Sequence, residues 1–179
     1  MMKSKINRLL IGLFVTLFIS FGGFYLYQWL WIEQPITSML ENQSNIHNDF
    51  QVKVTPSKVE VQLHPKKDFS LQQQYSLLMK QIEEKIGDRP IRIELSTPSD
   101  HLLEKAWSEM TFGVKEGISL QTYTQIPTTV SNIAEKYEIQ QRVSMDDQFV
   151  YIELRKENKY LFKVLPLQEQ KERVVKSNE

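Results

Sequence analysis

Near its start the chain carries 24 consecutive residues without a single charge. This apolar run extends from Leu9 to Ile32, and Gln28 is its only strongly polar side chain. At about 1.5 Å per residue, a helix of this length measures roughly 36 Å, which is enough to cross a hydrocarbon layer of about 30 Å with some tilt. The run therefore predicts one transmembrane helix over residues 9–32.

The two ends of the run differ in a way that predicts its orientation. Three cations precede it within residues 1–8, namely Lys3, Lys5 and Arg8, whereas the first charge after it is Glu33. Cationic flanks are retained in the cytoplasm. We therefore expect a short cytoplasmic end over residues 1–8 and place residues 33–179 outside the cytoplasm, in a single-pass protein of the cell membrane.

Aromatic side chains crowd the C-terminal end of the run. Amphipathic rings prefer the headgroup layer, so these residues are predicted interfacial anchors. They are Tyr25, Tyr27, Trp29 and Trp31.

A cleaved signal peptide is the alternative interpretation of this segment. The tripeptide Ser20-Phe21-Gly22 offers small residues where a signal peptidase would act. Cleavage there would leave a strongly apolar new N-terminus, and the run is longer than the 7–15 residues, roughly, of a signal-peptide core. The sequence favours an uncleaved signal-anchor.

Small residues recur along one face of the predicted membrane helix. Their spacings of four, four and three place them on one side, where they would let two helices approach closely. They predict a helix-packing face for a second copy or a partner, although a chance pattern explains them equally well. They are Gly12, Thr16, Ser20 and Gly23.

Composition excludes several classes of function for the part of the chain after the apolar run. Once the three leading cations are set aside, 19 cations remain against 22 anions, so no positive field would attract nucleic acid. The chain has no cysteine, which excludes disulfides, thiolate metal sites and cysteine nucleophiles. This composition is compatible with a bacterial extracytoplasmic protein.

Alternation of apolar and polar residues predicts strands, and apolar residues at helical spacing predict helices. A hairpin is expected from 50–54 and 59–63, followed by a helix at 70–86 with a Ser70/Gln73 capping box. A further strand, two helices and three strands are expected at 91–95, 99–110, 127–137, 141–145, 149–154 and 160–165. Gly113 and Gly117 leave the structure after residue 110 ambiguous, because each glycine costs helix stability.

These elements predict an α+β fold in the order ββα-β-αα-βββ. We expect a mixed, mainly antiparallel sheet with helices on one face, occupying residues 49–166. Residues 33–48 are polar and predict a stalk with one or two helical turns at most. Residues 167–179 are charged, lack periodicity and predict a mobile tail.

The sequence contains no recognisable catalytic, cofactor-binding or metal-binding pattern. Its histidines, His47, His64 and His101, are too far apart for a local ligand set. Asp146 and Asp147 are adjacent carboxylates, but they fit a hairpin turn. Neither a phosphate-binding glycine loop nor a GxSxG motif occurs. We therefore expect no enzyme activity and no cofactor.

The remaining features favour an interaction or assembly module in a bacterial cell-envelope complex. Its partners would be the lipid bilayer and another membrane or envelope protein, or a second copy of the chain. One alternative is an extracytoplasmic ligand-binding or sensory domain, which requires a concave pocket. A second is a membrane-tethered enzyme whose catalytic residues come from distant parts of the chain.

Overall fold

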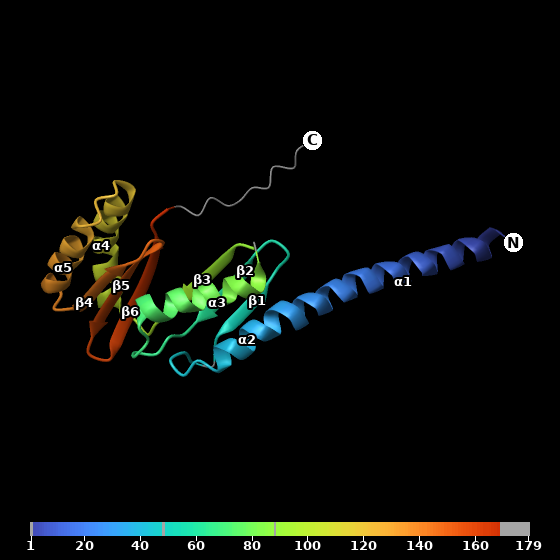
Figure 1. Ribbon diagram of the computed structural model, residues 1–179, viewed down its shortest axis with the longest axis horizontal. Coiled ribbons are helices and arrows are strands. Elements are labelled where there is room, and N and C mark those ends of the chain that lie inside the picture. The colour runs from blue at the N-terminus through green and yellow to red at the C-terminus, as the bar shows by residue number, and fades with distance from the viewer. Residues whose placement is uncertain (1, 48, 88, 169–179) are drawn as a thin grey trace.

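A computed structural model describes residues 2–47, 49–87 and 89–168, with side chains from residue 11 onward. A long N-terminal helix leads into a domain that contains two three-stranded sheets and further helices (Figure 1). The predicted α+β class is confirmed, and the order of elements follows the prediction roughly. The single sheet expected from the sequence is instead two sheets. Residues 169–179 of the predicted tail lie outside the described residues.

The N-terminal helix continues without interruption into the domain. It consists of α1 (Met2–Gln28), the π-helical segment η1 (Trp29–Glu33) and α2 (Gln34–Glu41), and the backbone stays right-handed helical at both junctions. Its residues Ile32, Ile36 and Leu40 are at most 5% exposed and belong to the domain core. Their spacing of four places them on one helix face. Much of the predicted stalk is therefore a core helix.

The first sheet combines the predicted hairpin with a parallel strand. β1 (Gln51–Val54) pairs antiparallel with β2 (Val59–Leu63), and β2 pairs parallel with β3 (Ile91–Leu95). The parallel connection passes through the π-helical turn η2 (Leu71–Tyr75) and helix α3 (Ser76–Ile86). A parallel pair requires such a crossover, and α3 covers the face that Val59, Val61 and Leu63 bury.

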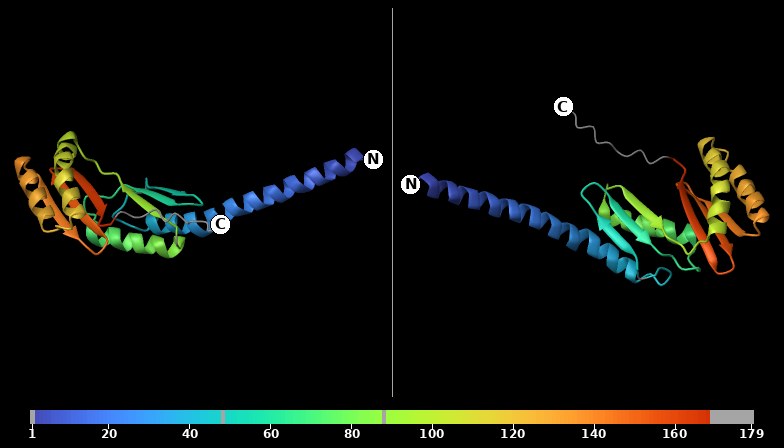
Figure 2. Two further views of the ribbon diagram at one scale, coloured as in Figure 1. Left: turned by 90° about the horizontal axis from the view of Figure 1, so that it is seen from above. Right: turned by 180° about the vertical axis from the view of Figure 1, so that it is seen from behind.

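The second sheet is an antiparallel meander preceded by a helical hairpin. Helices α4 (His101–Ser119) and α5 (Gln125–Lys136) pack on strands β4 (Gln140–Met145), β5 (Phe149–Lys156) and β6 (Lys159–Pro166). Figures 1 and 2 show this part at the end of the molecule farthest from the N-terminus.

Strand β5 is buried on both of its faces. Val150, Ile152 and Leu154 pack with α4 and α5, while Phe149 and Tyr151 pack with the core of the first sheet. Successive side chains of a strand point to opposite faces, so the second sheet separates two hydrophobic cores. This arrangement explains why the predicted strand at 149–154 is apolar at nearly every position.

The predicted capping box at Ser70 and Gln73 is wrong. Ser70 makes no side-chain capping bond, and its backbone N–H donates to the Oε1 of Gln74 instead. The first turn of this helix is π-helical over Leu71–Tyr75. A π-helical turn contains more residues than an α-helical turn. The glutamine whose side chain reaches back to the helix start is therefore Gln74 rather than Gln73.

Helix α4 continues through both glycines that made the sequence ambiguous. A Cβ at Gly113 would lie 2.6 Å from Thr129 Cγ2, and a Cβ at Gly117 would lie 2.7 Å from Ile126 Cγ1. Both contacts are with α5. The glycines weaken α4 as an isolated helix, but they allow close packing with its neighbour.

Candidate functional site

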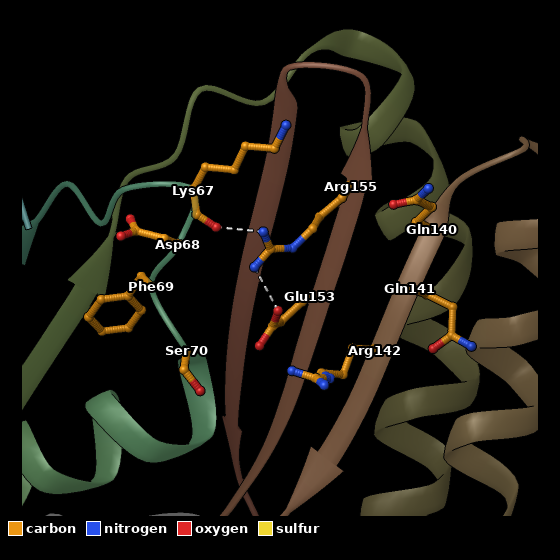
Figure 3. Close-up of a pocket in the computed structure, with 9 residues that line it drawn as sticks. All are labelled: Lys67, Asp68, Phe69, Ser70, Gln140, Gln141, Arg142, Glu153 and Arg155. Atoms are coloured by element: carbon orange, nitrogen blue, oxygen red, sulfur yellow. Dashed lines mark hydrogen bonds and ion pairs between the residues drawn. The ribbon is translucent and has the colours of Figure 1, made fainter. Parts of the chain in front are cut away.

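A polar cleft of about 400 Å³ lies where the loop after β2 meets the second sheet (Figure 3). One wall is the loop segment 67–70. The floor and the opposite wall come from β4 and β5, with residues 140–142, Glu153 and Arg155. The cleft has the size of a small-ligand site, but such sites are usually lined by apolar side chains.

The strand register brings the charged floor of the cleft together. Arg142 on β4 is paired with Glu153 on β5, and Gln140 is paired with Arg155. Paired residues of neighbouring strands point to the same face of a sheet, so all four side chains share the side that the loop crosses. β4 is an edge strand, which leaves its part of this face uncovered.

Glu153 joins the loop to the sheet. Its side chain is 6% exposed, and it accepts hydrogen bonds from the backbone N–H of Leu71 at 3.3 Å and from Arg155 Nη2 at 2.9 Å. The other guanidinium nitrogen of Arg155 donates to the carbonyl oxygen of Lys67 (Figure 3). A buried carboxylate needs such partners. These contacts fasten the two halves of the domain together and give each carboxylate oxygen of Glu153 one hydrogen-bond donor.

Arg142 is, together with Asp68, a charged group of the cleft that remains open to a partner. It is exposed, and within the described part of the chain its guanidinium makes neither a hydrogen bond nor an ion pair. A guanidinium matches the geometry of a carboxylate or phosphate. The Arg142 side of the cleft is therefore suited to bind an acidic group, and no nucleophile among the lining side chains is paired with a general base.

The predicted helix-packing face and the aromatic anchors are all exposed. A Cβ at Gly12 or Gly23 would meet no atom within 4 Å, and Thr16 donates its hydroxyl to the Gly12 carbonyl oxygen at 2.9 Å. The Tyr27 and Trp31 rings stack with centroids 6.3 Å apart. Among the described residues, this helix is the one long and apolar enough to cross a membrane.

The three histidines and the aspartate pair stay apart from the cleft. His64 Nδ1 lies 3.5 Å from Asp49 Oδ1, and His101 is exposed at the start of α4. In the ranges that the structure describes, no three His, Asp or Glu side chains form a group able to hold a metal.

Asp146 closes the β4–β5 turn. It accepts from the N–H groups of Gln148 and Phe149 at 2.8 Å and from the Tyr151 hydroxyl at 2.6 Å. Burial acts to raise the pKa of Asp146, but these hydrogen bonds prevail and lower the pKa below its usual value. These contacts support the turn interpretation of Asp146.

The sequence did not identify the cleft, although it contained one signal. Glu153 interrupts the otherwise apolar stretch from Phe149 to Leu154, and a charge inside a doubly buried strand requires partners. One partner, the N–H of Leu71, comes from 82 residues earlier in the chain, and the other is Arg155 on the same strand.

No protein-family model, curated protein or solved structure matches this chain. The geometry of the long apolar N-terminal helix and of the cleft therefore supplies the basis for a functional proposal.

Proposed function

We propose that this chain is a single-pass membrane protein whose extracytoplasmic domain is an assembly module in a bacterial cell-envelope complex. Its N-terminus would be cytoplasmic, held there by Lys3, Lys5 and Arg8. The observation that carries the proposal is the unbroken helix from the apolar run into the domain core. A domain fixed rigidly to its anchor is held in one orientation to the bilayer, as a component of an ordered assembly requires.

The far half of the domain is the surface best placed to meet a partner. The second sheet and its helices lie farthest from α1 (Figure 1), and strand β4 of this sheet contributes the exposed Arg142 to the cleft. An edge strand beside the cleft also has an unpaired side that a partner strand can use.

Site-specific crosslinking in native membranes tests this function. A photo-crosslinking residue at Gln140, on the same face of β4 as Arg142 and lining the cleft, should yield a reproducible adduct with an envelope protein. The same residue at Lys115, exposed on α4, serves as the matched control. Arg142→Glu should reduce the Gln140 adduct at least several-fold, while Lys115→Glu should leave it unchanged. A chain that remains an uncrosslinked monomer at both sites would contradict the proposal.

Topology is tested separately. A tag after Glu179 should be digested by protease added to intact spheroplasts, because the domain is proposed to lie outside the cytoplasm. A protected tag would place the domain inside.

A ligand-binding or sensory domain is the second candidate, favoured by the volume of the cleft and by Arg142. It predicts that small dicarboxylates or inorganic phosphate raise the thermal unfolding temperature of the detergent-solubilised protein, and that Arg142→Gln removes this increase. The polar lining of the cleft favours a protein contact over a small ligand.

A further inference from the structure

One side of the N-terminal helix is covered by the domain before the apolar run ends. Gln28 is 4% exposed and Ile32 is 5% exposed, although both belong to the run predicted to lie in the membrane. Strand β1 contacts η1 here, so the β1–β2 hairpin lies beside residues 29–33. Trp29 and Trp31 on the other side of the helix remain exposed.

This covering limits how deep the helix can enter the bilayer. A hairpin with polar side chains and sheet-edge backbone groups cannot enter hydrocarbon without a large free-energy cost. The hydrocarbon layer must therefore end before Gln28. Residues 9–27 then span it with roughly 28 Å of helix, close to the layer's thickness of about 30 Å. Trp29 and Trp31 come to lie in the headgroup layer, where such rings are favoured.

The same geometry identifies which end of the domain meets the headgroups. The hairpin turn 55–58 lies at the start of β2, and Val59 pairs with Ile91 at the start of the parallel strand β3. The Val59 N–H donates to the Pro90 carbonyl oxygen at 2.9 Å. Helix α3 ends nearby, shortly before β3 begins. Figures 1 and 2 show this end of the sheet directed along α1 toward the N-terminus.

This end presents two lysines that can reach a phosphate-bearing surface, beside the exposed Glu83 and Glu84 in the last turn of α3. Pro56, Ser57 and Lys58 are exposed at the turn, and Lys85 is exposed in the last turn of α3. Lys58 makes an ion pair with Glu60 at 2.6 Å, but half of its side chain remains accessible. Lysine side chains extend along a membrane surface and place their ammonium groups among phosphates.

We propose that the turn 55–58 and Lys85 form a docking surface for phospholipid headgroups, which seats the domain directly on the bilayer. This inference rests on the proposed membrane anchoring. It assigns the first sheet to the lipid surface and leaves the second sheet and the cleft for a protein partner.

Spin-label depth measurements test this seating, and the absence of native cysteine makes single labels possible in the full chain. The labelled variants are Ser57→Cys at the turn, Ser44→Cys in the exposed loop at the opposite end of the sheet, and Phe18→Cys in the middle of the span. Each is reconstituted in bilayers of phosphatidylcholine and phosphatidylglycerol. Oxygen and a water-soluble nickel chelate then report the depth of each label.

We expect the label at position 57 to read as headgroup depth, the label at 44 as aqueous and the label at 18 as hydrocarbon. Lys58→Glu together with Lys85→Glu should raise nickel accessibility at position 57 at least twofold without changing it at position 44. Thermal unfolding of each variant in detergent verifies that the domain is folded.

The outcomes separate this inference from the anchoring on which it rests. Aqueous readings at both 57 and 44, with position 18 in hydrocarbon, would overturn the seating and keep the anchor. Nickel accessibility at position 18 would overturn the anchor itself. A label at position 57 that keeps its depth in the double lysine variant would overturn the phosphate contact.

Discussion

Individual polar residues join parts of this fold that apolar packing alone would not fix. Glu153 is the clearest case, because its carboxylate is buried between the loop after β2 and the second sheet. Glu153→Gln keeps the shape of the side chain but removes the charge that pairs with Arg155 and replaces one acceptor oxygen by an NH2 donor. We expect a loss of about 1–3 kcal/mol in the free energy of unfolding, measured by chemical denaturation in detergent.

The control for this substitution is Glu104→Gln. Glu104 is half-exposed and lies 3.9 Å from Lys163, a geometry that contributes less than about 1 kcal/mol at a surface. Equal losses for the two variants would show that Glu153 has no special role in joining the halves of the domain.

Asp146 should make the stability of the domain sensitive to acid. The hydrogen bonds from Tyr151, Gln148 and Phe149 lower its pKa in the folded state below the usual 3.8, despite the opposing effect of burial. A lowered folded pKa contributes stability that is present above the unfolded pKa and is lost as pH falls through the folded pKa. We expect Asp146→Asn to lower the unfolding temperature at pH 7 and to weaken its decline below about pH 4.

Unfolding curves recorded at pH 7, 4 and 2.5 measure this difference. Asp147→Asn is the matched control, because Asp147 is exposed in the same turn. If the unfolding temperature of the Asp146→Asn variant falls with pH in the same way as that of the original chain, Asp146 does not cause the acid sensitivity.

Among the elements, the contact between α4 and α5 depends on the lack of a side chain. Gly113→Ala would place a Cβ 2.6 Å from Thr129 Cγ2, closer than atoms pack. The usual helix gain of about 1 kcal/mol for replacing glycine by alanine should therefore turn into a loss. Adding Thr129→Ala removes the clashing methyl group and should restore the gain. A double-mutant cycle of unfolding free energies measures this coupling.

Additive effects in that cycle would contradict the close approach of the two helices. A loss for Gly113→Ala that persists in the Thr129→Ala background would show that α4 requires glycine for another reason.

At the scale of the whole molecule, the small-residue face of α1 is open along the helix. If this face packs on a second copy, Gly12→Leu and Ser20→Leu should each reduce the signal of a membrane-helix association reporter at least twofold, because a large side chain separates the backbones. Gly22→Leu lies off this face and should leave the signal unchanged. A reporter insensitive to the first two substitutions would remove the dimer hypothesis.

The continuous connection between α1 and the domain also matters at this scale. Ile32, Ile36 and Leu40 are buried in the domain core, so a rotation or shift of α1 moves the domain with it. Packing of α1 on another helix would therefore set the orientation of the distal cleft as well.

Local patterns in the sequence determined the long apolar N-terminal helix, the hairpin at 51–63, the helix before Gly87 and the final meander. Each of these predictions depends either on apolar residues that repeat every two or 3.6 positions or on the length of an apolar run. Both features are contained in a short stretch of sequence. The α+β class followed from their order. The capping box at Ser70 failed because a π turn shifts the register by one residue, which no local apolar pattern reveals.

Only the tertiary structure decided that the strands form two sheets, that Gln28 lies beneath the domain, and that Glu153 and Arg142 share a cleft. These features depend on contacts between residues far apart in the chain, such as the hydrogen bond from Leu71 to Glu153, which spans 82 positions. A charge within an apolar strand shows that a partner is required. The fold alone determines which residue provides it.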